Sequence, residues 1–141
     1  MGLIYLLDTN VVSEMTKPVQ NQNVINRIVQ TQKKAALCSV TWGEALYGVK
    51  RMPEGKVKDL IMDFYIDSVQ KMYSFVDFDI HAASIYSDLK MRLEKIGKSA
   101  KEIDLQIAAC AISNNLILVT RNVKDFQNIQ EVSNLMMEEW F

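Results

Sequence analysis

Two short aliphatic runs that end on polar residues constrain the fold of this chain most strongly. Residues 3–7 form a continuous apolar segment that closes on Asp8, and residues 116–119 form another that closes on Thr120. Short apolar runs of this kind are typical of strands buried on both faces of a parallel sheet. Because such strands deliver side chains to a cleft at their carboxyl ends, we expect Asp8 and Thr120 to share one site.

Between these runs the apolar residues recur at helical spacing. Further strands are expected at residues 36–40, 74–78 and, as an edge strand, 133–137. Helices are expected around residues 24–29, 41–52, 57–64, 85–96 and 107–111, with Pro53 and Gly97 as stop signals. Strands separated by helices predict a single α/β domain over residues 1–141, with a mostly parallel central sheet flanked by helices on both faces.

The composition fits one compact domain without a strong electrostatic field. The formal net charge is −1 over 141 residues, so any nucleic acid must be bound locally rather than by a general basic surface. Cys38 and Cys110 lie in apolar stretches, which is typical of reduced core thiols and predicts no disulfide. The apolar start lacks a cationic leader region and is too short to span a membrane, so we expect a cytoplasmic protein.

Four acidic residues stand where a solvated surface charge would be unusual: Asp8, Glu44, Asp104 and Asp125. Asp104 lies at helical spacing from the small apolar residues at 107–111, on the face that must be buried. Burying a lone carboxylate is costly, and a bound cation removes that cost. Clustered carboxylates at strand ends are ligands for Mg²⁺ or Mn²⁺, and these ions lower the pKa of a bound water and neutralise charge during attack on a phosphodiester.

The acids also have structural interpretations, which the sequence leaves open. Thr41 and Glu44 fit a capping box, in which the glutamate reaches back to the threonine amide. Asp8 suits a turn or a helix N-cap, and Asp104 suits an N-cap. Asp125 would be an ordinary loop residue after the strand-end turn. His81 is the only histidine and is expected in the first turn of its helix, and the chain has no phosphate-binding glycine loop.

Six segments together resemble the motifs of one nuclease family. They are LLDTNVVSE at 6–14, SVTWGEALYG at 39–48, RMPEG at 51–55, DLQIAA at 104–109, LVTRNVKDF at 118–126 and EW at 139–140. In order and spacing they are similar to the PIN-domain nucleases, and within these to the VapC-type toxins of toxin–antitoxin modules, close to the FitB-like branch. The resemblance covers nearly the whole chain and implies an endoribonuclease that depends on Mg²⁺ or Mn²⁺.

The resemblance also implies a role for the main site residues. Asp8 and Asp104 would be the principal metal ligands, and Glu44 would support the ion or position its water. Thr9 and Thr120 would orient the carboxylates through hydrogen bonds.

The fourth acidic position is open, because relatives carry an acid either where this chain has Asn122 or where it has Asp125. We favour Asp125 as the fourth catalytic acid, with Asn122 and Asn10 as supporting polar residues. Basic residues near these motifs are candidates for contacts to RNA phosphates: Lys50, Arg51 and Arg121.

Two other functions use the same motifs. A haloacid-dehalogenase-like phosphohydrolase also has one strand ending in Asp and a later strand ending in Thr, but it needs a second Asp where this chain has Asn10. A non-catalytic PIN-like RNA-binding module would be expected to lose its acids, and at least three remain here.

Partners are implied by the resemblance as well. They are an RNA substrate, a cognate VapB-type antitoxin and a second copy of the chain in a homodimer, with no membrane. We expect the antitoxin tail to bind in a groove between the helices that flank Pro53 and to direct an Arg or Lys toward the carboxylates. Eight methionines supply adaptable apolar surface, although core filling accounts for most of them.

Overall fold

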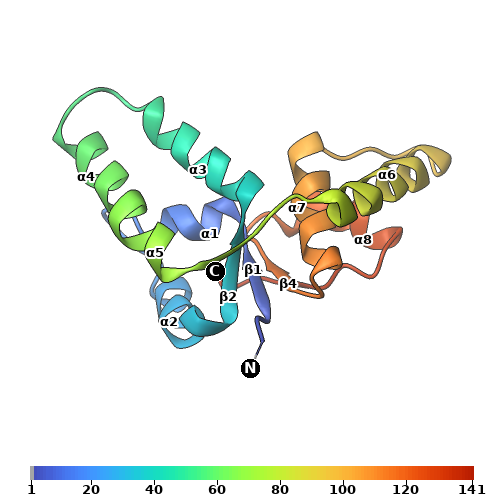
Figure 1. The fold of residues 1–141 in the computed structure, drawn as a ribbon, viewed down its shortest axis with the longest axis horizontal. Helices are drawn as coiled ribbons and strands as arrows, with labels where there is room; N and C mark the ends of the chain where they lie inside the picture. The colour runs from blue at the N-terminus through green and yellow to red at the C-terminus, as the bar shows by residue number, and fades with distance from the viewer. Residues whose placement is uncertain (1) are drawn as a thin grey trace.

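The computed structural model describes residues 2–141 and places a five-stranded parallel sheet at the centre of the molecule (Figure 1). The strand order is β3-β2-β1-β4-β5, and every neighbouring pair is parallel. The strands are β1 (Tyr5–Leu7), β2 (Ala35–Cys38), β3 (Ser74–Val76), β4 (Ile117–Val119) and β5 (Met137–Glu138). The predicted α/β architecture is confirmed, and the edge strand begins later than expected, at the end of the 133–137 segment.

Helices cover both faces of this sheet. They are α1 (Thr9–Glu14), α2 (Gln22–Thr31), the short 3-10 helix η1 (Gln32–Lys34), α3 (Ser39–Lys50), α4 (Lys56–Phe64), the π-helical segment η2 (Tyr65–Val69), α5 (Gln70–Met72), α6 (Ile80–Lys95), α7 (Glu102–Ser113) and α8 (Val123–Glu131). In Figure 1, α1 to α5 lie on one side of the sheet, and α6, α7 and α8 lie on the other. Within residues 2–141, none of the helices combines the length and apolar character needed to cross a bilayer.

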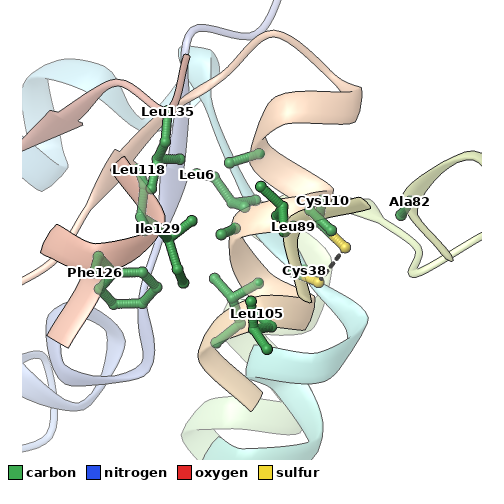
Figure 2. Packing of buried hydrophobic residues seen from close by; sticks show 14 of the residues in the cluster. Leu6, Cys38, Ala82, Leu89, Leu105, Cys110, Leu118, Phe126, Ile129 and Leu135 are labelled. Carbon is green, nitrogen blue, oxygen red and sulfur yellow. Dashed lines mark hydrogen bonds between the residues drawn. The ribbon is translucent and has the colours of Figure 1, made fainter. Parts of the chain in front are cut away.

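The central strand β1 and its neighbour β4 are buried on both faces, as their apolar runs predicted. Leu6 and Leu118 belong to the core cluster on the α6–α8 side, part of which is shown in Figure 2. Leu7 and Val119 belong to the cluster on the side of α1 to α5. All four side chains are fully buried. Because β1 and β4 are adjacent and parallel, Asp8 and Thr120 emerge side by side.

The two cysteines are free and buried, in agreement with the expectation of reduced core thiols. They face each other between β2 and α7, with their Sγ atoms 3.0 Å apart (Figure 2). This contact connects the strand that leads into α3 with the helix that carries Asp104.

Local sequence signals located α2, α3, α4, α6 and α7 but missed α1, α5 and α8. Gly97 ends α6 as expected: it has φ 69°, and the Lys98 amide donates to the Leu93 carbonyl over 2.9 Å. Helices α1 and α8 were not predicted, since each is short and presents few apolar residues.

The central position of β1 leads to a stability prediction. Leu6→Ala should lower the free energy of unfolding by about 3 kcal/mol, because it removes a fully buried side chain and leaves a cavity between β1 and α7. Chemical denaturation followed by circular dichroism measures the change. Val19→Ala is the control, since Val19 is 87% exposed and its truncation should change the stability by less than about 0.5 kcal/mol. Equal unfolding midpoints for the two variants would contradict this account of the core.

Candidate active site

All four predicted acids line one cleft at the carboxyl edge of the sheet. Its volume is about 560 Å³, and its lining comprises Asp8, Thr9, Asn10, Ser13, Glu44, Lys101, Glu102, Ile103, Asp104, Asn122 and Asp125. The acids come from four separate elements: the end of β1, the middle of α3, and the first turns of α7 and α8. The fold therefore brings together carboxylates that are far apart in the sequence.

Asp8 is the most deeply buried of these acids, with 6% of its surface exposed. The Thr120 hydroxyl donates to Oδ2 and the Thr9 amide donates to Oδ1, both over 2.8 Å. Asp8 is also the N-cap of α1, so its capping role and its place in the cleft coincide. Burial raises the pKa of Asp8, the two hydrogen bonds oppose this rise, and the nearby charges of Glu44 and Asp125 add to it.

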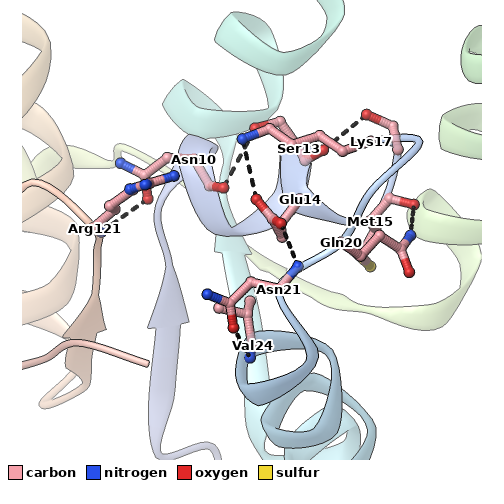
Figure 3. Close-up of polar contacts among 10 residues, drawn as sticks. Asn10, Ser13, Glu14, Met15, Lys17, Gln20, Asn21, Val24 and Arg121 are labelled. Carbon is pink, nitrogen blue, oxygen red and sulfur yellow. Dashed lines mark hydrogen bonds and ion pairs between the residues drawn. The ribbon is translucent and has the colours of Figure 1, made fainter. Parts of the chain in front are cut away.

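Asn10 connects the ends of β1 and β4. Its Nδ2 donates to Asp8 Oδ2 over 3.4 Å and to Thr120 Oγ1 over 3.5 Å. Its Oδ1 accepts from the Arg121 amide over 3.0 Å, a contact visible in Figure 3. The side chain thus holds the turn after β4 against the start of α1.

Glu14 anchors the other end of α1, a role that was not predicted from the sequence. Its side chain is buried. It accepts a hydrogen bond from the backbone amide of Asn21 over 2.7 Å and forms an ion pair with Lys17 Nζ at 3.1 Å (Figure 3). The Asn21 hydrogen bond is the main reason that the pKa of Glu14 is lowered. A single acid at the end of a short helix leaves no periodic signal, which is why sequence patterns do not reveal this role.

Glu44 is held in the cleft by Thr9, whose hydroxyl donates to Glu44 Oε1 over 2.8 Å. The capping-box interpretation of Thr41 and Glu44 is wrong. Helix α3 begins at Ser39 directly after β2, with Cys38 as its N-cap, so Thr41 already lies inside the first turn. The Thr41 hydroxyl is buried without a hydrogen-bond partner among the described residues.

Asp104 carries the unpaired oxygen of the cleft. Its Oδ2 is buried and has no hydrogen-bond partner within residues 2–141. Burial, followed by the charges of Asp8 and Asp125, raises the pKa of Asp104 to about 6, and Lys101 acts in the opposite direction. The alternative interpretation of Asp104 as an N-cap is wrong, because α7 starts at Glu102 and Lys101 occupies the cap position.

Asp125 and Asn122 both line the cleft, one turn of helix apart. The loop interpretation of Asp125 is wrong, because it lies in the first turn of α8, where a carboxylate interacts favourably with the helix dipole. Its Oδ2 is 3.9 Å from Lys101 Nζ. Asn122 is the residue before α8, and its amide donates to Thr120 Oγ1 over 3.0 Å.

The three basic residues selected from the sequence do not line this cleft. Lys50 and Arg51 lie at the end of α3, where the Arg51 guanidinium is 5.7 Å from the Tyr47 ring centroid. The guanidinium of Arg121 is 4.8 Å from the ring centroid of the C-terminal Phe141. Their contacts to RNA stay predictions, and Lys101, which does line the cleft, was not selected.

The donor set of the cleft suits a small divalent cation that keeps most of its water. No group of three or more His, Cys, Asp or Glu side chains in residues 2–141 forms a ready-made cage for an ion. Mg²⁺, however, is usually held by one or two carboxylates together with water molecules and substrate phosphates. The unpaired Oδ2 of Asp104, beside the oriented carboxylate of Asp8, matches this requirement.

Comparison with known proteins identifies relatives of this chain. The family described as PIN domain matches residues 5–132. The chain is 32% identical to ribonuclease VapC2 of Haemophilus influenzae, covering 98% of each chain, and 29% identical to the toxin FitB of Neisseria gonorrhoeae, covering 86% of this chain and 89% of FitB. The crystal structure of VapBC2 from Rickettsia felis bound to promoter DNA superposes with a TM-score of 0.81 at 26% identity, covering 99% of this chain and all of that one.

The raised pKa of Asp104 predicts a pH-dependent stability. Between pH 3.8 and about 6 the folded chain keeps a proton that the unfolded chain has released, so this group lowers stability as the pH rises through that window. Asp104→Asn should therefore raise Tm at pH 7.5 and raise it only about a third as much at pH 4.5, since the linkage is only partly developed there. Discounted for partial exposure, the gain is about 1 kcal/mol, or about 3 °C.

Thermal unfolding in EDTA at the two pH values measures this effect. Asp67→Asn is the control, because Asp67 is exposed and lies on η2, outside the cleft. A gain in Tm that is equal at both pH values would show that the substitution acts through packing rather than through charge.

Proposed function

The chain belongs to the PIN-domain family, and on this basis we propose that it is a Mg²⁺- or Mn²⁺-dependent endoribonuclease and the toxin of a toxin–antitoxin pair. One observation carries the proposal: four carboxylates from distant parts of the sequence line one cleft at the carboxyl edge of a parallel sheet. The similarity to a VapC ribonuclease over the whole chain supports the same conclusion.

The residues of the cleft divide the chemistry among them. We assign Asp8 and Asp104 as the main ligands of the cation, with Glu44 as a supporting ligand. When bound, such a cation lowers the pKa of a coordinated water and neutralises charge on the phosphate during in-line attack. Thr120 and Thr9 hold the Asp8 and Glu44 carboxylates by hydrogen bonds, which fixes their orientation before substrate arrives.

Asp125 completes the acidic set from the first turn of α8, and Asn122 supports it as a neutral neighbour. Hydrolysis would leave 5′-phosphate and 3′-hydroxyl ends on the RNA. The phosphohydrolase alternative gains no support, because Asn10 uses its amide to bind Asp8 and Thr120 and has no proton to exchange as an acid or base.

An apolar groove beside the cleft supports the antitoxin proposal. It lies between α1, α3 and α4, has a volume of about 220 Å³, and includes Ala45, Val49, Met52 and Ile61 in its lining. These residues come from α3, the turn after it and α4, on both sides of Pro53, where the groove was predicted from the sequence. Glu44 lines both the groove and the acidic cleft. A helix bound in the groove could therefore direct a basic side chain toward the carboxylates of the cleft.

The VapBC2 complex of Rickettsia felis, in which a related chain crystallised with promoter DNA, supports a VapB-type partner for this chain. The homodimer stays a prediction from the family resemblance. Action on RNA would place the protein in the cytoplasm.

The nuclease proposal predicts that cleavage depends on the cation and on Asp8. Purified chain, free of any partner, should cleave structured RNA with Mn²⁺ or Mg²⁺ and lose this activity in EDTA. Asp8→Asn should lower the rate by about 100-fold or more, as the loss of a few kcal/mol of transition-state stabilisation requires. Gel analysis of end-labelled RNA measures cleavage. Asp67→Asn is the matched control, and cleavage that persists in EDTA would exclude the proposed chemistry.

The antitoxin proposal predicts that a bulky side chain in the groove blocks the partner. Gly48 lines the groove, and a Cβ built there meets no atom within 4 Å, so Gly48→Leu should fold and fill the groove. Co-expression with a candidate VapB-type antitoxin and affinity purification should yield a complex with the wild type and not with Gly48→Leu. Gly43→Leu places the same side chain on α3 outside the groove and should still bind. Equal recovery of the partner with both variants would rule out this groove.

A further inference from the structure

Lys101 stands out in the lining of the acidic cleft. Among the described residues that form this lining, it is the one basic side chain. Its Nζ is 3.9 Å from Asp125 Oδ2, at the outer limit of an ion pair, and 78% of the side chain is exposed. The ammonium group is therefore close to the acids but free to contact a ligand that enters the cleft.

The position of Lys101 is unfavourable for the helix that follows it. It is the N-cap of α7, a helix of 12 residues, and its side chain makes no capping hydrogen bond. Ser, Thr, Asp or Asn at this position would satisfy the first amides of the helix. A cation there also opposes the positive end of the helix dipole. A residue that breaks two local rules at the edge of a site is expected to serve the site rather than the helix.

The charge of the cleft gives Lys101 a specific task. Five carboxylates line it, Glu102 included, and one divalent cation compensates only part of their charge against an incoming phosphate. The other basic candidates, Lys50, Arg51 and Arg121, do not line the cleft. The guanidinium groups of Arg51 and Arg121 lie over the rings of Tyr47 and Phe141. Lys101 is the residue placed to attract a phosphodiester at the mouth of the cleft.

We propose that Lys101 binds a phosphate of the RNA backbone beside the scissile bond, exchanging its long contact with Asp125 for a direct one with the substrate. This inference rests on the proposed ribonuclease function and names a binding contact within it. The contact is electrostatic and independent of base sequence, because an ammonium group reads only the phosphate. It contributes to substrate binding rather than to the chemical step.

Steady-state cleavage of a single-stranded RNA with Mn²⁺ tests the proposal. Lys101→Ala should raise KM about tenfold with little change in kcat, since it removes binding shared by the ground state and the transition state. Lys101→Arg should restore KM to within about twofold of the wild type, because it keeps the charge. Lys33→Ala, at an exposed lysine before β2 on the opposite edge of the sheet, should behave as the wild type.

The salt dependence of RNA affinity gives a second readout. Fluorescence anisotropy with labelled RNA should show that Lys101→Ala reduces the slope of log affinity against log salt by about 0.7, the value for one phosphate of a single strand. A purely structural role for Lys101 would not change this slope.

Three outcomes overturn the proposal. One is a KM unchanged from that of Lys33→Ala, and another is a salt slope equal to that of the wild type. The third is a fall in kcat with an altered Mn²⁺ requirement, which would show that Lys101 acts through the carboxylates. If the wild type cleaves no RNA, the ribonuclease proposal fails by itself. The anisotropy measurement then still tests the Lys101 contact. A lower RNA affinity of Lys101→Ala than of the wild type supports the contact, and equal affinity contradicts it.

Discussion

The burial of the Asp8 carboxylate is the constraint on which the cleft depends. A carboxylate that is only 6% exposed needs several hydrogen-bond donors, and its donors come from two places: the start of α1 and the end of β4. The Thr120 hydroxyl can reach Asp8 only because β1 and β4 are adjacent, parallel and in register. The order of the central strands is therefore a condition for the chemistry as well as for the core.

Without a bound cation, the clustered carboxylates of the cleft lower the stability of the folded chain. Asp8 and Asp104 both have raised pKa values, because burial and the charges of neighbouring carboxylates disfavour their charged forms. An oxygen of Asp104 is left without a hydrogen-bond partner among the described residues. A positive charge that enters such a site is stabilised by these carboxylates. The same attraction would act on the proposed cation, on the Lys101 side chain and on a basic side chain of the proposed antitoxin.

The acidic cleft and the apolar groove are physically joined through Glu44. This residue accepts a hydrogen bond from Thr9 on the cleft side and forms part of the groove between α1, α3 and α4. A partner that packs in the groove therefore lies against a side chain of the proposed metal site. Inhibition of the site would need no distant conformational change, because the partner would bind against Glu44, which also lines the cleft.

Local sequence patterns determined the buried strands, the helix stop at Gly97 and the candidacy of the four acids, because burial and chain termination depend on neighbouring residues. The patterns could not exclude a capping box at Thr41, an N-cap at Asp104 or a loop at Asp125, because these interpretations depend on where each helix begins. They also did not indicate that Lys101 faces Asp125 or that Cys38 meets Cys110. Only the tertiary structure decided these contacts, since they depend on which strands are adjacent and how the crossover helices pack, and no short segment contains that information.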